Sequence, residues 1–123
     1  MSLSNEKLIA IKENIPDIDI EGSVNAYTGS EDFYLELLDD WCNAGRAENM
    51  KKAFDADDMA TYRIEAHSLK GTSRMIGLES IAKLGEDLQF ACDRGDYDFV
   101  KANHAHAIEV LESTITLIKM LMD

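Results

Sequence analysis

The sequence predicts an all-α fold, an antiparallel up-down four-helix bundle with an additional short helix at its N-terminal end. Apolar residues recur every three to four positions over long stretches, and no stretch alternates as a strand would. One proline and seven glycines in 123 residues leave few obligatory turns. The segments that separate the helical stretches are short, and helices joined by short loops must alternate in direction.

The N-terminal third of the chain predicts one short and one long helix. Residues 4–14 are amphipathic, and a turn-rich stretch follows with one further helical turn around residues 21–26. Ser30 precedes two acids, which is typical of an N-cap because acids favour the positive end of a helix. The first long helix is therefore predicted over about residues 30–54. Its expected core face comprises Phe33 or Tyr34, Leu37, Leu38, Trp41 and Met50.

Three more helices are predicted, over about residues 58–76, 78–92 and 96–122. An acidic run precedes the first, a glycine separates the first from the second, and a tight turn with a glycine precedes the third. Their expected core faces comprise Met59, Tyr62, Ala66, Leu69, Ser73 and Ile76, then Ile81, Leu84, Leu88 and Ala91, and finally Val100, Ala107, Leu111, Thr114, Ile118 and Leu121.

Composition predicts a single domain over residues 1–123. The content of 46% hydrophobic and 29% charged residues is that of a globular protein with one modest core. A net charge of −12 argues against nucleic-acid binding, which usually needs a basic face. No apolar run reaches the ~20 residues that span a bilayer, and no signal peptide opens the chain. Two cysteines make no disulfide framework, so we expect a cytoplasmic protein without membrane contact.

The predicted helix 58–76 carries a histidine among cations on its exposed side. At about 100° per residue, Arg63, His67, Lys70 and Arg74 fall within roughly 60° of one another. The core stripe of this helix is centred about a quarter-turn away, so the histidine borders the buried face without belonging to it. A local basic patch on an acidic protein suits a phosphoryl group or an acidic partner surface, although a solvated helix face is the simpler explanation.

Gly71 lies one turn after the histidine. A glycine inside a helix costs about 1 kcal/mol relative to alanine, so its presence needs a reason. Either a partner approaches the imidazole closely, or a neighbouring helix packs tightly at this position.

The sequence motif of this segment resembles that of histidine-containing phosphotransfer (HPt) domains of phosphorelay signalling. That family shares His-x-Leu-Lys-Gly-Ser/Thr followed by a Gly-Ala/Leu step, and the corresponding residues here are His67-Ser68-Leu69-Lys70-Gly71-Thr72 and Gly77-Leu78. The resemblance extends over about residues 16–118. It includes Tyr34-x-x-Leu37-Leu38-x-x-Trp41, Leu84-x-x-x-Leu88-Gln89 and Arg94-Gly95-Asp96. Gln89 stands where many members have glutamate.

The resemblance implies a phosphocarrier and not an enzyme. His67 would accept a phosphoryl group from the aspartate of a response-regulator receiver domain, and Lys70 would neutralise the phosphoryl oxygens. Gln89 would hydrogen-bond the second ring nitrogen and orient the ring. Arg63 and Arg74 would steer the partner, with plain surface charge an equal alternative for both.

Phosphoryl transfer also needs a magnesium ion and a carboxylate cluster. In the resembled family the receiver domain supplies both, so no cofactor or metal is expected in this chain. The expected partners are a receiver domain, a hybrid histidine kinase or both, and the chain is expected to be a monomer.

Other functions fit the sequence less well. Autophosphorylating kinases place an acid directly after the histidine, where this chain has Ser68. Di-iron bundles need Glu-x-x-His, and His104 and His106 are two apart and point in different directions on a helix. The remaining alternative is a helical docking module that binds a signalling partner without carrying phosphate.

Overall fold

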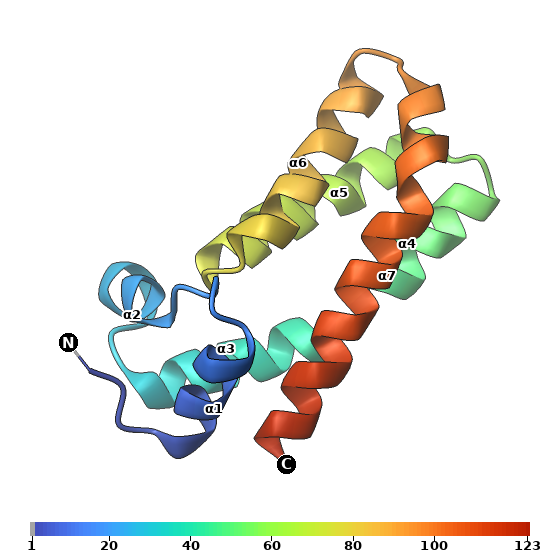
Figure 1. Ribbon diagram of the computed structural model, residues 1–123. Helices are drawn as coiled ribbons and strands as arrows, with labels where there is room; N and C mark the ends of the chain where they lie inside the picture. The colour runs from blue at the N-terminus through green and yellow to red at the C-terminus, as the bar shows by residue number, and fades with distance from the viewer. Residues whose placement is uncertain (1) are drawn as a thin grey trace.

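The computed structural model describes residues 2–123, so Met1 of the predicted domain lies outside the described residues (Figure 1). These residues form helices without a strand, which confirms the predicted all-α fold class. The elements are α1 (Glu6–Asn14), α2 (Ile20–Ser23), the π-helical turn η1 (Val24–Thr28), α3 (Glu31–Asn43), α4 (Arg46–Asp55), α5 (Met59–Met75), α6 (Glu79–Asp93) and α7 (Tyr97–Met122).

The long helices pack around one apolar core. Helices α5 and α6 lie side by side and are joined by a short turn, so they run antiparallel (Figure 1). Helix α7 runs along most of the molecule, packs on α6, and also contacts α1, α3 and α4. The largest fully buried side chains are Tyr34, Tyr62, Leu8, Ile11, Ile18, Ile20, Leu38, Met50, Leu69, Ile76, Ile81 and Leu88.

The predicted continuous helix over residues 30–54 was wrong. It is two helices, α3 and α4, separated by Ala44 and Gly45. Gly45 has a φ of 72°, a left-handed conformation that interrupts the α-helix and that glycine adopts without steric cost. The interruption places Arg46 at the first position of α4.

The predicted helix starts are present as hydrogen-bonded caps. The hydroxyl of Ser30 accepts a bond from the backbone N–H of Phe33 at 3.1 Å. The Asp58 carboxylate accepts from the N–H of Thr61 at 3.1 Å, and Asp96 accepts from that of Phe99 at 3.2 Å. The choice between Phe33 and Tyr34 for the core is also decided, because Tyr34 is fully buried while Phe33 is 50% exposed.

Helices α5 and α6 approach each other closely beside the α5 turn that carries His67. A Cβ atom on Gly85 of α6 would lie 2.9 Å from the carbonyl oxygen of Ala66 and 2.9 Å from the backbone nitrogen of Lys70. Only glycine permits this backbone contact. Gln89 follows one turn later on α6 and is thereby brought close to the neighbouring turn of α5.

Candidate functional site

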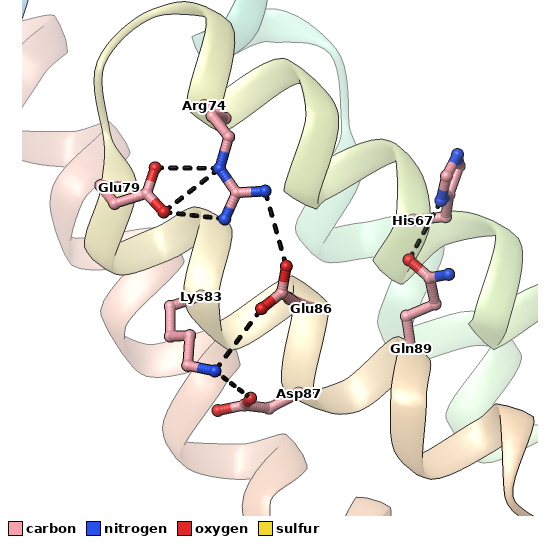
Figure 2. A network of polar contacts seen from close by, with 7 residues as sticks. All are labelled: His67, Arg74, Glu79, Lys83, Glu86, Asp87 and Gln89. Atoms are coloured by element: carbon pink, nitrogen blue, oxygen red, sulfur yellow. Dashed lines mark hydrogen bonds and ion pairs between the residues drawn. The ribbon is translucent and has the colours of Figure 1, made fainter.

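His67 is exposed on α5, and one of its ring nitrogens is held by a side chain of α6. Nδ1 lies 3.0 Å from Oε1 of Gln89 (Figure 2). An amide oxygen can only accept a hydrogen bond, so Nδ1 carries the proton, and in the neutral ring Nε2 then keeps its lone pair. Gln89 itself is 6% exposed, and such a buried polar residue needs a partner. The contact therefore selects the ring tautomer that is nucleophilic at Nε2.

Lys70 lies one turn after His67 and faces the same flank of α5. Its Nζ is 5.4 Å from the centroid of the Phe90 ring, a cation–π contact that holds the ammonium group beside the site. Lys70 has no ion pair with any residue between 2 and 123. Its charge is accordingly available to an incoming anion.

The two arginines that were predicted to lie near His67 both bind carboxylates of α6. Arg63 donates through Nε to Asp93, and this contact is the main reason why the pKa of Asp93 lies below its ordinary value. Arg74 lies 2.7 Å from Glu79 and 3.5 Å from Glu86 (Figure 2). Their positive charges are thus largely balanced within the molecule.

Gly71 is exposed, and its surroundings rule out one of the two explanations for it. No heavy atom lies within 4 Å of the position that a Cβ on Gly71 would occupy. Close helix packing at this residue is therefore excluded for residues 2–123. The helix surface one turn beyond His67 is open to an approaching molecule.

Two residues of α6 that contact the site were missed by the sequence analysis. Phe90 lies under Lys70, and Asp93 binds Arg63. Both could have been found from Gln89, because Phe90 follows it directly and Asp93 lies four residues on, on the same helix face.

The other histidines lie outside this site. His104 is 8% exposed, and its Nδ1 is 2.8 Å from the Tyr62 hydroxyl, whereas His106 is exposed. Residues 2–123 contain no cluster of three or more His, Cys, Asp or Glu side chains suited to a metal ion. None of the helices in that range is long and apolar enough to cross a lipid bilayer.

The model of the Hpt domain family matches residues 36–122, which include α5 and α6 with the whole candidate site. The chain belongs to the Hpt domain family. The helical bundle agrees with this membership, and Hpt domains are phosphocarrier modules that work with response regulators and kinases in phosphorelays. Comparisons with curated proteins and with solved structures returned no match.

Proposed function

We propose that this Hpt domain is a phosphorelay intermediate that accepts a phosphoryl group on Nε2 of His67 and passes it on. The exchange partner is the phosphorylated aspartate of a response-regulator receiver domain. The observation that carries the proposal is the pair of His67 and Gln89. An exposed imidazole whose Nδ1–H is bound to an amide oxygen presents the Nε2 lone pair to solvent, where a partner can reach it.

The transfer is a displacement at phosphorus. The Nε2 lone pair attacks the phosphoryl group of the aspartyl phosphate, an N–P bond forms, and the P–O bond to the aspartate breaks with the electron pair leaving on the carboxylate. The reverse step returns the group. The partner supplies the magnesium ion and the carboxylates that this step needs, and Lys70 supplies a cation for the phosphoryl oxygens.

The expected partners are a receiver domain, a hybrid histidine kinase or both, and this domain acts as a monomer. We place the exchange in the cytoplasm. Both cysteines, Cys42 and Cys92, are free thiols, in keeping with a reducing compartment.

Phosphoryl transfer from a panel of phosphorylated receiver domains tests the proposal. The wild-type chain should acquire an acid-labile label, and His67→Gln should acquire none while keeping its helical content and melting temperature. His106→Gln is the matched control, because it removes an exposed histidine from α7 and should label normally. Label on His67→Gln, or label that survives acid, would show that another residue is the acceptor.

The competing function is a docking module that carries no phosphate. It predicts that the wild-type chain binds a receiver domain without ever becoming labelled, and that His67→Gln binds with unchanged affinity. The absence of label from every phosphorylated receiver that binds would favour this alternative.

A further inference from the structure

The Gln89 amide has two ends of nearly the same shape and opposite hydrogen-bonding character. Its oxygen accepts, its NH2 group donates, and a half-turn of the amide exchanges the two. With the oxygen toward His67, as in Figure 2, the neutral ring has its proton on Nδ1 and its lone pair on Nε2. With the NH2 group toward the ring, the proton would move to Nε2, and Nε2 could no longer attack phosphorus. The reactive form of His67 therefore requires a group that keeps the amide from turning.

Asp93 lies one turn after Gln89 on the same face of α6. The pKa of Asp93 lies below its ordinary value mainly because Arg63 donates a hydrogen bond to it, and a hydrogen bond from Gln89 and the charge of Lys70 act in the same direction. An amide stabilises a carboxylate only through its NH2 group. The NH2 end of Gln89 therefore faces Asp93, while its oxygen faces His67.

Asp93 is itself held from α5. Nε of Arg63 donates to Oδ1 of Asp93, and both side chains are partly exposed. An ion pair at the surface contributes little to stability. Asp93 is also the last residue of α6, where the helix dipole disfavours a negative charge, and the last turn of this helix has no basic residue. Helix stability therefore does not explain a carboxylate at this position.

We propose that Asp93, held by Arg63, is a positioning residue that keeps the Gln89 oxygen on Nδ1 of His67 and thereby keeps the lone pair on Nε2. A carboxylate has only acceptor oxygens, so it fixes the direction of each hydrogen bond that follows. Gln89 must donate to Asp93, and its oxygen is then left to accept from the ring. The proposal rests on the proposed function and names the groups that keep its acceptor in the reactive form.

The test compares the full chain with Asp93→Asn. Asparagine keeps the shape of aspartate but offers either a donor or an acceptor, so Gln89 becomes free to turn. The ¹⁵N resonances of His67, measured about two pH units above its titration in each variant, should show the proton on Nδ1 in wild type and a mixture of tautomers in Asp93→Asn. Labelling of His67 by phosphoramidate, which needs no receiver, should slow about two- to tenfold.

A second background separates this role from a structural one. Gln89→Glu puts two acceptor oxygens and no donor beside His67, so turning the side chain cannot change the tautomer. In that background Asp93→Asn should leave the proton on Nδ1, and labelling should stay within about twofold of Gln89→Glu alone. A residue that only maintains the end of α6 would lower labelling equally in both backgrounds.

Two further variants complete the comparison. Asp87→Asn is the matched control, because it removes a negative charge from the same helix at a residue that pairs with Lys83 at 3.0 Å. It should leave the tautomer and the labelling rate unchanged. Arg63→Gln should change the resonances in the same direction as Asp93→Asn but less, since Asp93 can still accept from Gln89. Arg63→Gln also provides the test should Asp93→Asn unfold.

The outcomes separate the positioning role from the proposed function. If the proton stays wholly on Nδ1 in Asp93→Asn, or if the loss is the same with glutamate at position 89, Asp93 does not position the amide. A wild-type ring with its proton on Nε2 would overturn the proposal as well. A wild-type chain that has the expected tautomer but exchanges phosphoryl groups with no receiver would instead refute the proposed function and leave the role of Asp93 in place.

Discussion

His67 and Gln89 form the contact on which the proposed chemistry depends. The Gln89 oxygen accepts from Nδ1–H at 3.0 Å, and in the neutral ring this places the lone pair on Nε2. Lys70 approaches the same flank and is held by the ring of Phe90. At the scale of single residues, each of these contacts makes a separate prediction.

Replacing Gln89 with leucine should slow phosphoryl transfer without unfolding the domain. The leucine fills a similar volume but cannot accept the Nδ1 hydrogen, so the ring can also adopt the tautomer with the proton on Nε2. Loss of one neutral hydrogen bond is worth about 0.5–1.5 kcal/mol, or about a two- to tenfold lower rate. The ¹⁵N resonances of His67 should change toward a mixture of tautomers. Unchanged resonances would mean that Gln89 does not select the tautomer.

Lys70→Ala should slow transfer or shorten the lifetime of phosphorylated His67. The lost charge-assisted contact is worth about 1.5–3 kcal/mol before solvent weakens it. Lys83→Ala is the control, because Lys83 is an exposed lysine of α6 that pairs with Asp87 at 3.0 Å. Rapid-quench measurements with phosphorylated receiver should separate the two variants. Equal transfer rates for the two variants would mean that Lys70 is only a surface charge.

Two glycines in the paired helices α5 and α6 have different roles. Gly71 of α5 has open space where a side chain would begin, whereas a Cβ on Gly85 of α6 would meet the backbone of α5 at 2.9 Å. Both lie inside helices, where glycine is intrinsically unfavourable. The difference between them comes from the neighbouring element alone.

Substitutions at the two glycines should therefore change stability in opposite directions. Gly71→Gln should raise the free energy of unfolding by about 0.5–1 kcal/mol while receiver binding and transfer fall, because the new side chain obstructs the surface beside His67. Gly85→Ala should lower that free energy by about 1–3 kcal/mol, since the backbones must move apart. Urea denaturation and receiver titration on the same preparations measure both effects. A destabilised Gly71→Gln would contradict the open surface seen at this residue.

At the scale of the whole molecule, His104 connects three helices in the core. Its Nδ1 is 2.8 Å from the hydroxyl of Tyr62 on α5, and its ring stacks on Phe54 of α4 at a centroid distance of 3.9 Å. Burial lowers the pKa of His104, Lys51 lowers it further, and Asp55 opposes them. A neutral ring with its proton on Nε2 can accept from the Tyr62 hydroxyl through Nδ1, whereas a protonated ring can only donate.

His104 should make the domain less stable in mild acid. Because its pKa in the folded state lies below its ordinary value of 6.5, the unfolded chain binds a proton first as the pH falls. Stability is unaffected by this group well above pH 6.5 and is lost as the pH falls below it, with a slope of at most about 1.4 kcal/mol per pH unit. Urea denaturation at pH 7.5 and 5.5 should show a smaller loss for His104→Gln than for wild type. Equal losses would assign the acid sensitivity to other groups.

Much of the fold followed from the sequence because its signals are local. The apolar period of each long helix, the caps at Ser30, Asp58 and Asp96, and the turns between helices depend on residues within a few positions of one another. The same holds for the exposed position of His67, which follows from the angle between it and the core stripe of its own helix. The break at Gly45 was missed although glycine itself marked it, because the apolar pattern continued on both sides.

The contacts between neighbouring helices were decided by the tertiary structure alone. The carboxylates that bind Arg63 and Arg74, the ring under Lys70 and the different roles of Gly71 and Gly85 all depend on the distance and rotation between neighbouring helices. Helical periodicity tells which face of a helix is buried. It does not tell how far that helix slides or turns against the next one, because many side chains set this jointly through packing.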